Sequence, residues 1–182
     1  MLRDRCRLSV RCDTMEPSAA LSTSAQIAVA IAGFAGIVVA VRNESVHNWG
    51  QVEKFWLRLL LVNSILPLTF SMVGLLFLVI KPVSPSTWRW CSGFAAIFLF
   101  PYATIIIKNL FRFAPGQLKA AGGGKFTSYS LCALLTAVCM LQLCNITTLV
   151  AFWPFFCAIV SLLLGAMYQF VRLIIIPQPP GT

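Results

Sequence analysis

The chain has 182 residues, of which 59% are hydrophobic and only 10% are charged. A soluble domain has roughly 45–50% apolar and about 25% charged residues, so this composition excludes a soluble globular protein. The formal net charge is +9. The basic residues stand between long apolar runs, which is typical of membrane topology and does not predict a nucleic-acid partner.

Each bilayer crossing needs about 20 mostly apolar residues. The five crossings described below therefore leave only tails and short loops, and no room for a soluble catalytic domain. The seven cysteines form an odd number without a CxxC pair. Since several fall within apolar runs, we expect buried thiols rather than a disulfide or metal framework, and no cofactor.

Residues 1–23 form a polar, arginine-rich N-terminal tail. Met15 is an alternative start, in which case the first fourteen residues would be an artefact. The first apolar run, 24–41, is longer than the apolar core of a secretory signal, which has about 7–15 residues. We therefore predict a retained transmembrane helix.

Small residues recur at every fourth position of this first run, at Ala28, Ala32, Gly36 and Ala40. That spacing places them on one face of a helix. In lipid, close van der Waals packing is the main force between helices, and small side chains permit it. We predict that this stripe is the closest packing surface of the bundle.

The second and third apolar runs, 55–80 and 88–107, contain Pro67 and Pro101. A proline inside a helix removes one backbone hydrogen bond, so we predict two kinked, antiparallel neighbours. Asn63 lies four residues before Pro67 and needs partners where there is no water. It should therefore face the interior of the bundle or a wet cavity.

The last two apolar runs, 127–144 and 148–176, are separated only by 145–147. Asn145 or Thr147 is a candidate cap between them. The sequence therefore predicts an all-α, polytopic transmembrane bundle with five spans, which forms one domain over 24–176 and is followed by a short tail, 177–182.

Positively charged residues predict the orientation. The first loop, the third loop and the C-terminal end together carry more Lys and Arg than the opposite side, and the margin widens if translation begins at Met15. We therefore expect the N-terminus outside and the C-terminus in the cytoplasm.

Two short motifs carry little chemistry. Arg42 and His47 form an R-x-x-x-x-H pattern that resembles the motif of the HEPN ribonuclease family, a soluble helical bundle. Here the arginine closes a membrane span, so a nuclease is disfavoured. The segment Gly122–Lys125 lacks the upstream glycine and the following Ser or Thr of a phosphate-binding P-loop, and we interpret it as a flexible linker.

The polar residues inside the apolar runs that remain candidates for function are amides, namely Gln26, Asn63, Gln142 and Gln169. No acid lies within these runs, which argues against a proton-coupled pump. Buried amides either join helices by hydrogen bonds or line a path for a solute, and the sequence leaves both alternatives open.

Four segments resemble small multi-pass proteins of bacterial inner membranes: GFAGIVVAVR (33–42), NSILPL (63–68), FWPFF (152–156) and QFVRL (169–173). The resemblance covers about residues 24–176. It implies a bacterial inner membrane and no particular activity, because this group has none assigned.

We therefore expect a non-enzymatic integral membrane protein that acts through helix packing with itself or with a membrane partner. The alternative is an oligomeric channel or facilitator for a small uncharged solute, lined by Asn63, Gln142 and Gln169. In either case we expect the lipid bilayer to surround the helices.

Overall fold

The structure is a computed structural model that describes residues 16–41, 51–80, 85–112 and 125–175. In these ranges the chain forms α-helices and one short π-helix, without any strand. Five of the helices are long and apolar enough to cross a membrane, so the predicted five-helix bundle is confirmed and has the architecture of an integral membrane protein. The elements are α2 (Pro17–Val41), α3 (Gln51–Ile80), α4 (Pro85–Arg112), α6 (Lys125–Cys144), η2 (Asn145–Leu149) and α7 (Phe152–Ile175).

The helix boundaries differ from the predicted ones mainly at the beginnings. The first helix begins at Pro17 instead of residue 24. Proline fits the first turn of a helix because its missing N–H would have no partner there, and Ala20 and Leu21 are buried against other helices. The last helix begins at Phe152 instead of 148, because the chain first passes through η2 and a turn.

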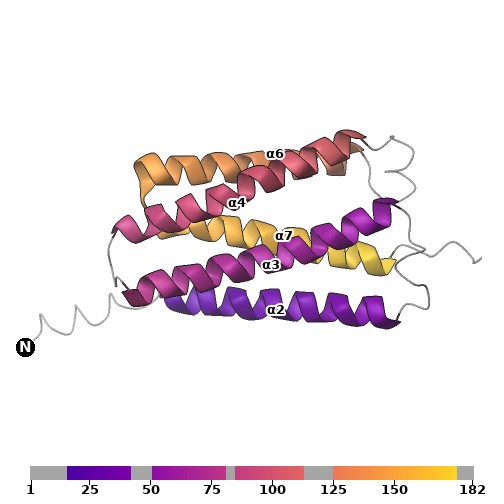
Figure 1. Cartoon of the computed structure of the whole chain (residues 1–182), viewed down its shortest axis with the longest axis horizontal. Helices are drawn as coiled ribbons and strands as arrows, with labels where there is room; N and C mark the ends of the chain where they lie inside the picture. The colour runs from indigo at the N-terminus through magenta and orange to yellow at the C-terminus, as the bar shows by residue number, and fades with distance from the viewer. Residues whose placement is uncertain (1–15, 42–50, 81–84, 113–124, 176–182) are drawn as a thin grey trace, which may run out of the picture.

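The helices run alternately up and down, with α2 and α6 on opposite sides of the bundle and α3, α4 and α7 between them (Figure 1). The most extensive contact is between α2 and α3. Helix α7 contacts each of the other four long helices, so it is the central element of the fold.

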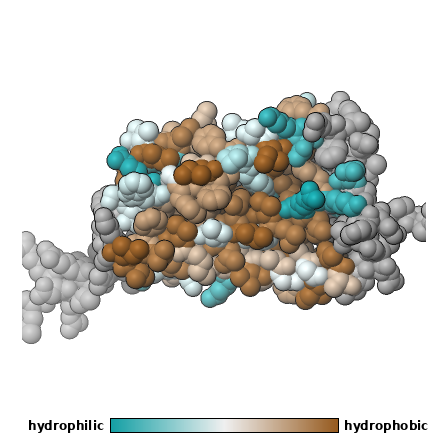
Figure 2. All heavy atoms as spheres, in the orientation of Figure 1, coloured by the Kyte–Doolittle hydropathy of each residue, from teal (hydrophilic) through white to brown (hydrophobic). Residues whose placement is uncertain are grey.

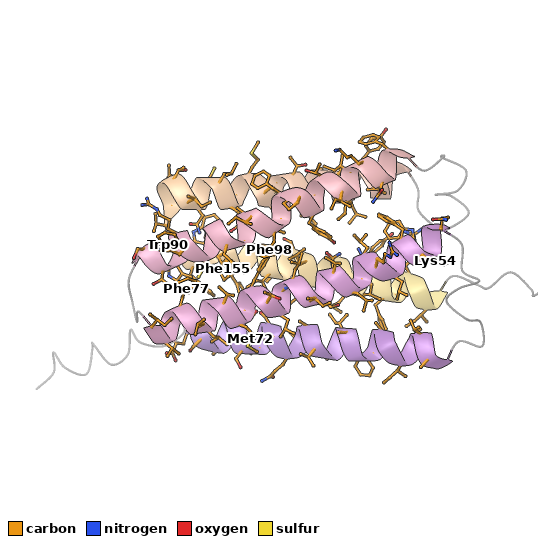
Figure 3. The ribbon with its side chains drawn as sticks, in the orientation of Figure 1. Lys54, Met72, Phe77, Trp90, Phe98 and Phe155 are labelled. Carbon is orange, nitrogen blue, oxygen red and sulfur yellow. The ribbon has the colours of Figure 1, made fainter. Side chains whose placement is uncertain are left out.

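The main core combines aliphatic and aromatic side chains, and its aromatic part, the aromatic core, lies in the half of the bundle away from Lys54 (Figure 3). Phe70 of α3, Leu99 of α4 and Phe155 of α7 are fully buried there. The ring of Phe70 packs at 6.2 Å from that of Phe94 and at 6.4 Å from that of Phe155. Figure 3 shows Phe155 in this half, and Lys54 at the opposite end.

On the face drawn in Figure 2, apolar residues cover most of the surface between the two ends. The described lysines and arginines lie at the end of the bundle that contains the start of α3 and the end of α7, with the exception of Arg89, which lies at the start of α4. We call the end of the bundle that contains the start of α3 and the end of α7 the basic end. At this end the guanidinium of Arg172 lies 3.9 Å from the centroid of the Trp56 ring.

Candidate functional site

The candidate site is built on one face of α7, where Ser161, Gly165 and Gln169 follow one another at a spacing of four residues. Side chains at this spacing lie above one another on a helix. A Cβ atom at Gly165 would lie only 3.2 Å from Asn63 Nδ2. The glycine therefore allows the amide of Asn63, on α3, to lie directly against α7.

A second contact joins Asn63 to α4. The hydroxyl of Tyr102 donates a hydrogen bond to Asn63 Oδ1. Asn63 is buried and Tyr102 is half-buried. Since a phenol and an amide both need polar partners away from water, this bond fixes the two side chains together inside the bundle.

These residues border a cavity of about 50 Å³ in the half of the bundle nearer the basic end. Helices α3, α4, α6 and α7 all contribute to its wall. We call this cavity the amide pocket. Its lining consists of Leu59, Asn63, Tyr102, Ile106, Leu131, Leu134, Leu135, Val138, Ser161, Leu162, Gly165 and Gln169.

Gln169 is the unusual member of the amide pocket. Its side chain is only 3% exposed, and neither Nε2 nor Oε1 has a hydrogen-bond partner within the structure. An amide buried without partners costs about 2–7 kcal/mol relative to water, depending on the reference state. A polar occupant of the neighbouring cavity that reached these two atoms would remove this cost.

The lining combines hydrogen-bonding groups with apolar walls. It offers amide, hydroxyl and phenol groups, but no carboxylate, imidazole or amine. Such a site can hold an uncharged polar molecule by hydrogen bonds. No family model, curated protein or solved structure matches the chain.

The structure buries all three of the amides that were predicted to line a path, but it does not bring them together. Asn63 and Gln169 share the amide pocket, whereas Gln142 is not part of its lining. Gln142 Nε2 donates instead to the carbonyl oxygen of Pro154 at 2.8 Å. The amide pocket therefore includes two of the three amides, and a path lined by all three stays a prediction.

Sequence reasoning missed Tyr102, Ser161 and Gly165. The signal for two of them was present, because Ser161 and Gly165 precede Gln169 at regular intervals of four. Tyr102 directly follows Pro101 inside an apolar run, and a phenol there requires a partner. Its hydrogen bond with Asn63 depends on how α3 and α4 pack, and the spacing of residues within either helix does not predict that packing.

The predicted stripe of small residues lies only partly against other helices. Ala28 is buried and Ala32 is half-buried, but Gly36 and Ala40 are exposed. A Cβ atom at Gly36 would meet nothing within 4 Å. The face of α2 that is buried in the bundle shares only Ala28 with this stripe and consists of Ala20, Leu21, Ser24, Ala25, Ala28 and Ala35.

The two prolines occupy different environments. Pro67 is fully buried within α3, and Pro101 is exposed on α4. Both helices continue through their proline without interruption. The predicted kinks remain predictions.

A second polar cluster connects α6 to α7 around the fully buried Asn145. Its Nδ2 donates to Ser92 Oγ at 2.6 Å and to the carbonyl of Ala151 at 3.0 Å, and its Oδ1 accepts from the N–H of Ala151 at 2.9 Å. Of the two candidate caps, Asn145 thus binds the residue that precedes α7. The hydroxyl of Thr147 donates back to Leu143 at 3.0 Å instead.

Other candidate chemistry falls largely outside the described residues. Arg42, His47 and the 122–124 segment lie there. Within the described ranges no group of three His, Cys, Asp or Glu residues lies close enough to hold a metal ion. The cysteines of these ranges are free thiols, namely Cys91, Cys132, Cys139, Cys144 and Cys157.

Proposed function

We propose that this chain is a non-enzymatic integral membrane protein that binds a small uncharged polar molecule in the amide pocket. The observation that carries the proposal is Gln169, which is buried at the cavity with both of its side-chain polar atoms without partners. Small-molecule sites are usually concave pockets with mostly apolar walls and a few polar groups that orient the ligand, and the amide pocket has this composition.

The size of the cavity supports a small occupant. A water molecule needs roughly 10–15 Å³ of such volume, and the cavity has about 50 Å³. The pocket therefore has space for at least one water, or for another small molecule. Leu134 lines the pocket and is 45% exposed, so the wall on the α6 side is only one side chain thick.

The aromatic core supports binding rather than conduction through one chain. Phe70, Leu99 and Phe155 fill the other half of the bundle and are each 0% exposed. A solute in the amide pocket therefore meets packed side chains on the way to that end. Conduction would require a path between several copies of the chain.

The pocket can be tested with a cysteine at its wall. In a variant without native cysteines, we expect Ser161→Cys to react with the small neutral reagent methyl methanethiosulfonate and not with its charged sulfonatoethyl analogue. Ser71→Cys is the matched control, because Ser71 is 0% exposed and lies outside the lining, and should react with neither. A Ser161→Cys thiol that resists both reagents, or reacts equally with both, would contradict the proposal.

Packing with a second copy or a membrane partner is a second candidate function, supported by the outer face of α2. Gly33 and Gly36 are exposed there with nothing within 4 Å of a built Cβ, and the amide of Gln26 is exposed on the same helix. Native mass spectrometry in nanodiscs tests this candidate for self-association. Detection of single chains alone would leave only a different protein as the partner.

We also place the basic end in the cytoplasm of a bacterial inner membrane, with the N-terminus outside. The support is the excess of Lys and Arg at that end. Labelling of single introduced cysteines with a membrane-impermeant reagent, from either side, tests this orientation.

A further inference from the structure

We propose that the ligand of the amide pocket is a small planar molecule with a carboxamide group, such as a primary amide or a urea. This inference rests on the proposed function and narrows it to one class of ligand. The groups that would recognise the ligand come from three helices: Asn63 of α3, Tyr102 of α4, and Ser161 and Gln169 of α7.

The first argument is the pairing capacity of Gln169. Its N–H donor and its carbonyl acceptor lie side by side on one planar group, and both lack partners. A carboxamide presents the complementary acceptor and donor at the same spacing, so it can satisfy both atoms at once through two parallel hydrogen bonds. A single hydroxyl cannot align with both atoms together, because each bond needs its own near-linear geometry.

The second argument is the balance of donors and acceptors in the lining. Because Tyr102 donates to Asn63 Oδ1, the other end of that amide, Nδ2, is a donor, and it lies beside Gly165. With Gln169 Nε2 and the hydroxyl of Ser161, the pocket contains several donors. A carbonyl oxygen can accept two of them, which favours a carbonyl compound over an amine.

The third argument is charge and size. The remaining lining residues are aliphatic, mostly leucines of α3, α6 and α7. Burying a carboxylate or an ammonium among them without a counter-charge would be costly, so the ligand is neutral. The volume of about 50 Å³ exceeds the roughly 10–15 Å³ that one water needs, so the ligand is a small molecule.

The test is thermal unfolding of the full chain in nanodiscs with four probes: acetamide, acetone, ethylene glycol and acetate. We expect a saturable rise in Tm with acetamide, and at least a tenfold higher concentration for the same rise with acetone, which has the same number of non-hydrogen atoms and a carbonyl group but no N–H. Acetate should give no saturable effect. In Gln169→Leu the response to acetamide should be lost, whereas Ser71→Ala should respond as the wild type does.

The outcomes separate the ligand class from the proposed function. If ethylene glycol acts at the same concentration as acetamide, and both need Gln169, the carboxamide class is overturned while binding of a neutral molecule stands. If acetamide stabilises Gln169→Leu as well as the wild type, this site is overturned. If no neutral probe has a saturable effect on the wild type, the carboxamide class is overturned, and if Ser161→Cys is also unreactive, the proposed function is overturned with it.

Discussion

Replacing Gly74 by leucine should destabilise the bundle by about 3 kcal/mol, whereas the same replacement at Gly36 should not destabilise it and should raise its stability by up to about 1 kcal/mol. A Cβ atom at Gly74 would lie 2.9 Å from Leu21 Cδ1 of α2 and 3.3 Å from Phe155 Cε1 of α7. Both neighbours are fully buried, so neither can move away without disturbing the core. At Gly36 a Cβ meets nothing within 4 Å.

The alanine variants give a sharper comparison, because alanine is favoured over glycine within a helix by about 1 kcal/mol. Gly36→Ala should therefore raise stability by up to that amount. At Gly74 the steric contact opposes this gain, so Gly74→Ala should be neutral or destabilising. Reversible unfolding in mixed detergent micelles, followed by circular dichroism, measures all four variants. Equal effects at the two glycines would mean that α2, α3 and α7 do not meet at Gly74.

The number and type of the helices could be predicted from the sequence because the apolar runs are too long for a soluble core. The burial of Asn63 and Gln169 could be predicted for a related reason, since an amide surrounded by apolar residues must find polar neighbours away from lipid. These inferences depend only on the fact that lipid surrounds the helices. They do not depend on how the helices are arranged against one another.

The packing face of α2 could not be predicted, and the reason lies in its composition. Alanine and glycine occur around most of this helix, so the spacing of Ala28, Ala32, Gly36 and Ala40 did not distinguish the buried face from the exposed one. In the structure, the large side chain of Leu21 lies on the buried face of α2 and contacts α3 at Gly74. Likewise, the pairing of Tyr102 with Asn63 spans two helices and leaves no trace in the spacing of either.

Replacing Asn145 by leucine should cost about 3 kcal/mol, because one side chain holds the connection between α6 and α7. The change removes three hydrogen bonds and leaves Ser92 Oγ and both backbone groups of Ala151 without these partners. A buried polar group that loses its partner costs about 1–3 kcal/mol. The neighbouring Val150 has a left-handed backbone, with φ 45°, which disfavours a β-branched residue. The bonds of Asn145 hold the chain in this strained turn.

Thr147→Val is the matched control, because the Thr147 hydroxyl is exposed and bonds only to carbonyl oxygens of its own helical turn. Its effect should stay within about 0.5 kcal/mol. A double-mutant cycle between Asn145→Ala and Ser92→Ala should yield a coupling energy of about 1 kcal/mol, since the two side chains are in direct contact. Additive effects in that cycle, with Asn145→Leu no worse than Thr147→Val, would show that the connection between α6 and α7 is held by the packing of the helices and not by this amide.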